Sequence, residues 1–201
     1  MEPYNLIFDA NILALEQEDC WSEAATLAYR QWKLSPNLLN SLLCAGTELW
    51  YALLLATRNK ENPHEFTQEK GLQDNLMEVT RWGLNYFADS VAFNGYFGYM
   101  IKVMPYFFPD YNGDYIGWET KGITMMRHSH EIDPTNPFAK AMLYEPDYYG
   151  KGTPFFEACS EIWANITPVQ WGASAVQQYF FYILFGDVFF PNAYKNIEDN
   201  I

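Results

Sequence analysis

The sequence has few cysteines and no long run of apolar residues. Of its 201 residues only Cys20, Cys44 and Cys159 are cysteines, and no two of them form a Cys-x-x-Cys pair. An odd and scattered set argues against a disulfide framework and a zinc site, so three reduced thiols are expected. The longest apolar run, Leu49 to Ala56, is much shorter than the about 20 residues that span a bilayer. With no basic and apolar leader at its start, the sequence predicts a cytoplasmic protein that does not associate with membranes.

Basic side chains are also scarce. The chain has 12 Lys and Arg against 25 Asp and Glu, which gives a formal net charge of -13. Such a surface repels phosphate backbones and anionic lipids, so direct nucleic-acid binding is not expected. The same charge favours a basic protein as partner. A second interpretation stays open, because acidic surfaces also serve solubility alone.

The sequence lacks the motifs that carry chemistry. It has no phosphate-binding glycine loop, no Gly-x-Ser-x-Gly elbow and no cysteine with an evident histidine partner. His128 and His130 are two residues apart and point to different sides of a helix, whereas a shared ion needs a four-residue step. Glu61 and His64 make a single Glu-x-x-His pair, although di-iron bundles need two. We therefore expect no catalytic residue, no metal and no cofactor, and predict that the protein is not an enzyme.

What the sequence does contain is a large helical core. It is 49% hydrophobic and 18% aromatic, and its long periodic segments repeat apolar residues at the helical step, with none alternating at period two. The length fits one domain. We predict a single all-α domain over residues 1–201, built of about eight or nine helices in irregular hairpins, with possible internal boundaries at 58–67 and 105–117.

The helix limits follow from the periodicity and from cap residues. Helices are expected at 5–16, 20–35, 38–57, 68–89, 91–104, 118–132 and 137–144, and from Thr153 and Thr167 onward. The last two starts pair threonine with a following proline, and Thr167 and Gln170 also have capping-box spacing. Gly46 lies inside the third helix, and Gly95 and Gly98 lie inside the fifth, where small residues predict closely packed neighbouring helices.

Two parts of the chain resemble the tetratricopeptide-type helical repeats. The residues that carry the resemblance are Leu42, Ala45, Gly46 and Leu49, preceded by Ala24, Ala28 and Pro36, and later Gly122, Met126, Ser129 and Pro134. The resemblance covers about half of the chain and implies an α-α superhelix or bundle. It further implies that helical hairpins present a surface to another protein.

Two irregular segments rich in aromatic residues are the candidate binding surface. Exposed aromatic side chains on loops are typical interface anchors, and neighbouring carboxylates suit lysine or arginine on a partner. The candidate partner-binding residues are Tyr106, Asp110, Tyr111, Asp114, Tyr115, Glu145, Asp147, Tyr148 and Tyr149. An alternative remains, in which these loops fold back over the core.

Small size, acidic charge and the absence of catalytic motifs together make the chain similar to immunity proteins of bacterial toxin and immunity pairs. That resemblance implies a protein that binds and neutralises a basic toxin, which can be a nuclease. Two other functions stay open. One is a helical ligand-binding domain or enzyme with an aromatic pocket, and the other is a scaffold subunit of a larger complex.

Overall fold

The computed structural model describes residues 6–58, 70–108, 115–144, 153–165 and 174–189. Within these ranges lie nine α-helices and one short 3-10 helix, and no strand, so the predicted all-α fold is confirmed. The elements are α1 (Ala10–Gln17), α2 (Trp21–Leu34), α3 (Leu39–Arg58), α4 (Lys70–Tyr86), α5 (Val91–Val103), η1 (Pro105–Phe107), α6 (Tyr115–Ile132), α7 (Pro137–Leu143), α8 (Pro154–Asn165) and α9 (Ala175–Phe189).

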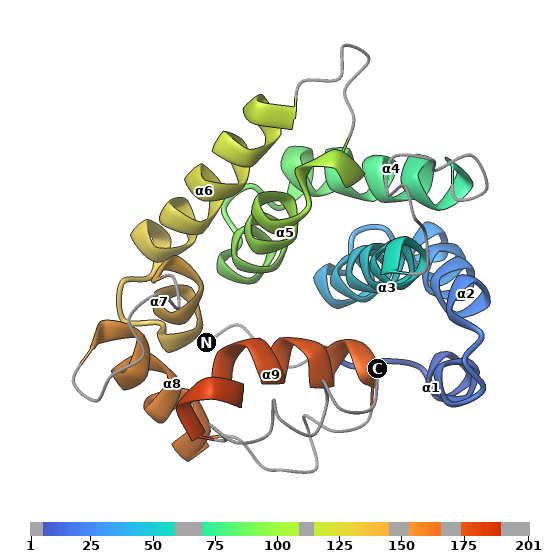
Figure 1. Cartoon of the computed structure of the whole chain (residues 1–201). Helices are drawn as coiled ribbons and strands as arrows, with labels where there is room; N and C mark the ends of the chain where they lie inside the picture. Colours follow the sequence, from blue (N-terminus) through green and yellow to red (C-terminus); the bar gives the residue numbers. More distant parts are fainter. Residues whose placement is uncertain (1–5, 59–69, 109–114, 145–152, 166–173, 190–201) are drawn as a thin grey trace.

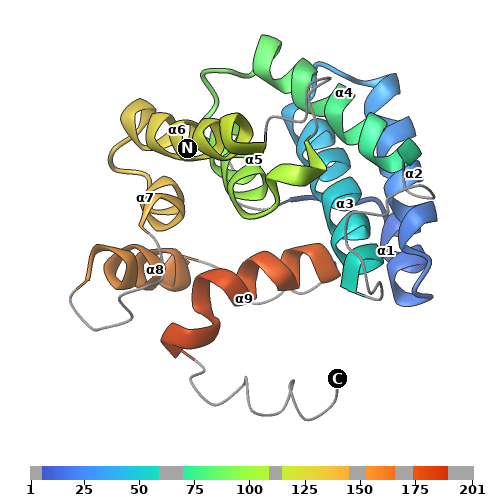
Figure 2. The same cartoon turned by 45° about the horizontal axis from the view of Figure 1, so that its top comes forward.

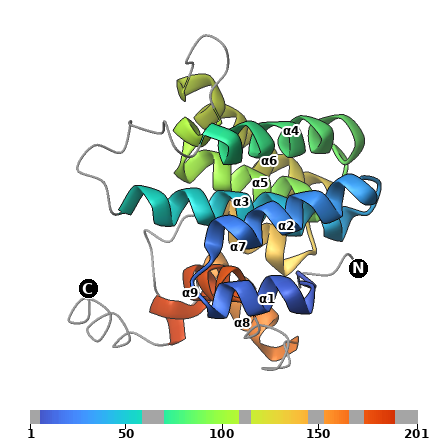
Figure 3. The same cartoon turned by 90° about the vertical axis from the view of Figure 1, so that its right-hand side faces the viewer.

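Two helices form the middle of the molecule, and the others surround them. Figure 1 shows α3 and α5 inside a ring made by α2, α4, α6, α7, α8, α9 and α1. Most helices pack on the next helix along the chain, and α2, α3 and α4 lie side by side in Figure 3. Figure 2 shows α9 running along the opposite side of α3 and α5 from α4. A single hydrophobic cluster joins these helices through large, fully buried side chains such as Trp32, Trp50, Phe97 and Phe180.

Glycines let the central helices approach closely, as the sequence predicts. A Cβ on Gly46 of α3 would collide with the ring of Phe97 on α5. On α5, a Cβ at Gly98 would lie 2.9 Å from the backbone oxygen of Gly122 on α6, and one at Gly95 would lie 2.6 Å from the Phe138 ring on α7. These glycines are therefore contact points between helices, and the aromatic stretch of α5 is buried.

The length and apolar composition of α3 would allow it to cross a membrane. Its apolar stretch, Leu39–Thr57, is the one such candidate in the described part of the chain, and most of that stretch is buried inside the fold. Burial of this kind is also found in the core helices of proteins that never enter a membrane.

Besides the final helix, three helix ends differ from the predicted limits by three residues or more. α1 begins at Ala10 and not at Asn5, because the Asp9 carboxylate caps it by accepting the Asn11 backbone N–H at 2.8 Å. α4 ends at Tyr86, before the predicted Asp89. α6 begins at Tyr115, three residues before the predicted start, so Tyr115 lies on a helix and not on a loop.

The final helix begins later than predicted. Ser174 is not helical and caps α9: its hydroxyl accepts the backbone N–H groups of Val176 (3.1 Å) and Gln177 (3.4 Å), while Gln177 Oε1 accepts the backbone N–H of Ser174 at 3.2 Å. This exchange is a capping box. The predicted start at Thr167 lies outside the described residues, but one helix running from there through Val176 is wrong. The predicted start at Thr153 is confirmed, since its hydroxyl accepts the Phe156 backbone N–H at 3.2 Å.

Candidate functional site

Most of the predicted partner-binding residues lie outside the part of the chain that the structure describes. These are Asp110, Tyr111, Asp114, Glu145, Asp147, Tyr148 and Tyr149. Tyr106 and Tyr115 are described, and the structure gives them different surroundings. Their role in binding stays a prediction.

Tyr106 belongs largely to the fold. Its hydroxyl donates to the sulfur of Met104 at 2.7 Å, its ring meets that of Phe107 edge to face at 4.9 Å, and its backbone oxygen accepts from Gln73 Nε2 at 3.0 Å. Burial raises the pKa of the Tyr106 hydroxyl. At this residue the alternative interpretation, a segment that folds back over the core, describes the contacts better.

Tyr115 lies on an exposed turn at the start of α6. Its side chain is 45% exposed, and that of its neighbour Ile116 is 78% exposed. Glu119 is exposed one turn later, on the same face. We call Tyr115, Ile116 and Glu119 the α6 patch. Tyr115 is therefore a predicted partner-binding residue that stays open to a partner, with a large exposed aliphatic side chain beside it.

A buried side chain in the same turn anchors the α6 patch. Trp118 is buried, its ring lies 5.8 Å from that of Phe108, and the ammonium of Lys121 lies 5.2 Å from the ring of Trp118. The α6 patch is therefore held on a helix that is fixed to the core, which keeps the entropy cost of binding low.

A second exposed apolar surface lies where α2, α3 and α4 meet. Leu34 is 85% exposed, and Leu38 and Tyr86 are also exposed. The indole of Trp82 joins them, because its Nε1 donates to the backbone oxygen of Pro36 at 3.0 Å and its ring stacks 4.3 Å from that of Tyr86. We call Leu34, Leu38, Trp82 and Tyr86 the α4 patch. Sequence reasoning missed this patch, because apolar residues at helical spacing are assigned to the buried face of a helix.

Glu16 is a buried acid at the N-terminus of α9. Its Oε1 accepts from the Ser174 hydroxyl at 2.8 Å and its Oε2 accepts from the backbone N–H of Ala175 at 2.7 Å. A helix N-terminus has free N–H groups and a partial positive charge, so it favours a carboxylate. Glu16 therefore ties α1 to the first turn of α9.

Glu48 on α3 is a second buried acid, in hydrogen-bond contact with Glu16. Its side chain is 1% exposed, and its Oε1 has no hydrogen-bond partner among the described residues. Burial, together with the hydrogen bond and the like charge of Glu16, raises the pKa of Glu48 well above its ordinary value. A proton on Glu48 removes the like charge that would otherwise face Glu16 in this buried place.

All three cysteines are free, and two of them are buried. Burial, and to a lesser extent the charge of Glu48, raises the pKa of the Cys44 thiol to about 12. Burial also raises the pKa of the Cys159 thiol to about 12. A thiol acts as a nucleophile only as the thiolate, so neither group is activated near neutral pH.

The pocket beside Cys44 is small. It measures about 280 Å³, below the range of about 300–1,000 Å³ that holds most small-molecule ligands. Asn40, one of its polar residues, already exchanges hydrogen bonds with the backbone of Ile7, accepting its N–H at 3.1 Å and donating to its oxygen at 2.9 Å. Its walls do not favour the ligand-binding alternative.

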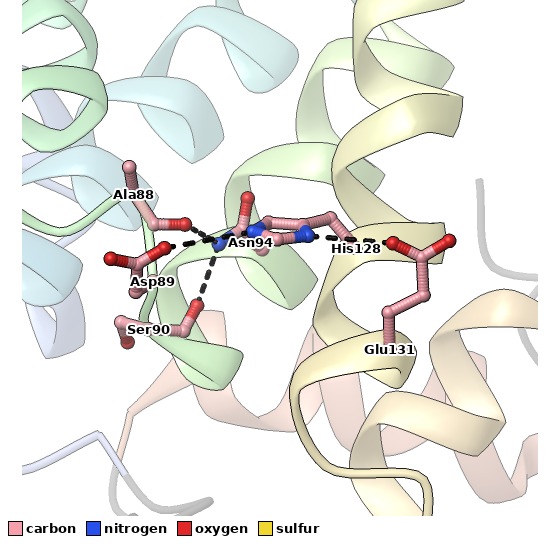
Figure 4. A network of polar contacts seen from close by, with 6 residues as sticks. All are labelled: Ala88, Asp89, Ser90, Asn94, His128 and Glu131. Atoms are coloured by element: carbon pink, nitrogen blue, oxygen red, sulfur yellow. Dashed lines mark hydrogen bonds and ion pairs between the residues drawn. The ribbon is translucent and has the colours of Figure 1, made fainter.

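His128 lies between two exposed carboxylates, as Figure 4 shows. Its Nε2 is 3.8 Å from Oδ1 of Asp89, and its Nδ1 is 3.5 Å from Oε2 of Glu131. Asn94 fixes the turn that carries Asp89, because its side-chain N–H groups donate to the backbone oxygens of Ala88 (2.6 Å) and Ser90 (2.8 Å). This network links the turn between α4 and α5 to α6.

The two histidines do not form a site together. The buried Nδ1 of His130 has no hydrogen-bond partner in the described ranges, and no group of three or more metal-binding side chains occurs there. Glu157 and Glu161, one turn apart on α8, are both exposed and form a solvated face.

Several exposed carboxylates have no basic partner among the described residues. Glu18, Asp19, Glu23, Asp74, Glu119 and Glu157 are exposed, and no described lysine or arginine forms an ion pair with them. Unpaired charge of one sign produces a field that attracts a basic molecule from a distance.

Comparisons with known proteins leave the class of the chain open. No protein-family model matches it, and neither the search of curated proteins nor that of solved structures found a match. The geometry described above therefore carries the functional argument by itself.

Proposed function

We propose that the chain is a non-catalytic protein-binding module whose partner is a basic protein. The observation that carries the proposal is the α6 patch, where Ile116 is 78% exposed beside Tyr115 on a helix fixed to the core. Aromatic and aliphatic anchors supply most of the affinity at protein interfaces. The acidic surface around them would speed the encounter with a basic partner.

In its sharpest form, the proposal is that the chain is an immunity protein that covers a basic toxin, with a nuclease as one candidate. Small size and a net charge of -13 support this form. So does the inert chemistry of the described residues, in which the buried acids and thiols are out of reach of a substrate. Stoichiometric binding, without turnover, is then the whole activity.

The test is a binding measurement on two isomeric truncations. Ile116→Ala and Leu34→Ala each remove the same number of atoms from an exposed residue, one from the α6 patch and one from the α4 patch. The ligand is the purified product of the neighbouring reading frame, titrated by calorimetry at low and at physiological salt. Truncating a true anchor costs about 2 kcal/mol or more, roughly thirtyfold in affinity. We expect that loss for Ile116→Ala and no change for Leu34→Ala.

Glu119→Gln tests the electrostatic part. Removing a rim carboxylate should slow association at low salt, and the difference should shrink as salt rises, because the Debye length falls to about 8 Å at physiological ionic strength. A loss of affinity for Leu34→Ala alone would show that the α4 patch is the interface. If the wild-type chain does not bind, the tested protein is not its partner. Unchanged affinity in both truncations would show that the α6 patch does not bind this partner.

A further inference from the structure

The attachment of α9 combines a hydrophobic contact with a buried acid pair. Along the helix, Phe180 lies against three rings of the middle helices, with centroid distances of 6.2 Å to Trp50, 5.0 Å to Tyr96 and 5.8 Å to Tyr99. Tyr179 adds contacts with Trp50 at 5.4 Å and with Tyr51 at 5.6 Å. These rings form an aromatic face on α3 and α5 that α9 covers.

The first turn of α9 is held by polar contacts beside the buried side chain of Val176. Glu16 accepts from Ser174 and Ala175, and the Gln177 side chain donates to the backbone oxygen of Leu6. Glu48 lies behind Glu16, fully buried. The contacts of Ser174 and Ala175 depend on the Glu16 carboxylate staying in place, with the buried Glu48 beside it.

We propose that Glu16 and Glu48 form a proton-dependent latch that holds the first turn of α9 on α1 and α3. In the closed state one proton lies between the two carboxyl groups, and Glu16 keeps its bonds to α9. When a base in solvent takes that proton, two negative charges face each other in a buried place. The repulsion and the cost of burying an unpaired charge are relieved when the first turn of α9 lifts and water enters.

The other ionisable groups around the pair do not take over this role. The Cys44 thiol on α3 has a pKa of about 12, and burial also raises the pKa of Tyr96 on α5, so both stay neutral over the range in question. The groups facing the pair from α9 are Ser174 and Gln177, which do not titrate. No described lysine, arginine or histidine acts on Glu48.

The direction of the pH effect follows from proton uptake on closing. The pKa of Glu48 is raised in the closed state above its ordinary value of 4.5, so closing binds a proton. The stabilisation is fully present below that ordinary value and is lost as pH rises through the raised pKa. α9 should thus be held more firmly in mild acid than in mild alkali, and its opening should increase by up to about tenfold for each pH unit within this window.

Hydrogen exchange on the full-length chain tests the latch. Exchange of the α9 amides is measured at about pH 5.5 and at about pH 8.5, each divided by the unfolded-chain rate at the same pH, with α5 as internal reference. In the wild type, α9 should lose protection relative to α5 as pH rises. In Glu48→Gln, where the amide donates to Glu16 without titrating, α9 protection should be independent of pH.

Glu18→Gln is the matched control, because it removes an exposed carboxylate two residues from Glu16, and it should behave as the wild type does. Glu16→Gln removes the second charge of the pair and should reduce the pH dependence without abolishing it, because burial still raises the pKa of Glu48, so a poorly folding Glu48→Gln does not end the test. Constant protection of α9 in the wild type would overturn the proposal. So would an unchanged pH dependence in the Gln variants, or a loss shared equally by α5.

Discussion

α5 and α9 both lie against the middle of the fold, but different physics holds each one. α5 is buried over almost its whole length, and its backbone meets that of α6 at Gly98 and Gly122. α9 is held by a few rings and by a hydrogen-bonded acid pair at its first turn. Close backbone packing involves no titratable group, whereas the acid pair can gain or lose a proton. One helix is therefore a permanent part of the core, and the attachment of the other depends on solution conditions.

The largest expected effect comes from a substitution that disrupts the packing of α5. Phe97→Ala removes a fully buried ring that fills the space over Gly46 and stacks 4.6 Å from Phe93. Large-to-small changes of this kind cost about 3–5 kcal/mol of unfolding free energy. Urea unfolding followed by circular dichroism should show that loss at all pH values. Leu34→Ala, which truncates a side chain that is 85% exposed, serves as control and should change stability by at most about 0.5 kcal/mol.

Gly122→Ala should have the next largest effect. Its new Cβ would lie 2.6 Å from the backbone nitrogen of Lys102 and 2.7 Å from the backbone oxygen of Gly98, neither of which a side-chain rotation can move. We expect a loss of about 1–3 kcal/mol from overpacking.

The control for this substitution is Gly71→Ala, at the start of α4. A Cβ there meets nothing within 4 Å, so alanine should gain up to about 1 kcal/mol from its helix propensity. Equal melting temperatures for the two variants would show that α5 and α6 do not meet through their backbones.

The smallest expected effect comes from a substitution at the start of α9. Ser174→Ala removes the cap hydroxyl and one donor to Glu16, and loss of an N-cap costs about 1 kcal/mol. The loss should appear as faster exchange in the first turn of α9, with α5 unchanged. Ser160→Ala, on the neighbouring α8, gives a matched control because that hydroxyl only bonds within its own helix, to the Phe156 backbone oxygen. Equal acceleration in α5 would contradict the separation of the two regions.

Local sequence signals predicted most of the helical fold. Apolar periodicity located each helix, and Gly46 and Gly98 predicted close packing without naming the partner, since a glycine shows that space is needed and not which ring or backbone fills it. The start of α9 was missed because the chain offers two capping boxes, Thr167 with Gln170 and Ser174 with Gln177. The second receives a carboxylate from α1, and that contact is tertiary.

The candidate site was less predictable for the same reason. Glu16 and Glu48 stand beside Leu15 and Leu49 in apolar stretches, a signal that an acid is buried, but their meeting depends on how α1 and α3 pack. Tyr115 was expected on a loop and lies on α6, because the helix begins three residues early. The α4 patch depends on the turn at Pro36 that brings Trp82 to it, a contact without a local pattern.

The bonds between α1 and α9 also bear on the order of folding. The Leu6–Gln177 and Glu16–Ser174 contacts join residues 171 and 158 positions apart. Closing so long a loop costs more entropy than forming the neighbouring helix pairs, so such contacts form late. During synthesis, Glu16 is therefore made long before Ser174 and Ala175, which donate hydrogen bonds to its carboxylate. We expect α2 to α6 to fold first, and the acid pair to be buried only when α9 closes over the aromatic face.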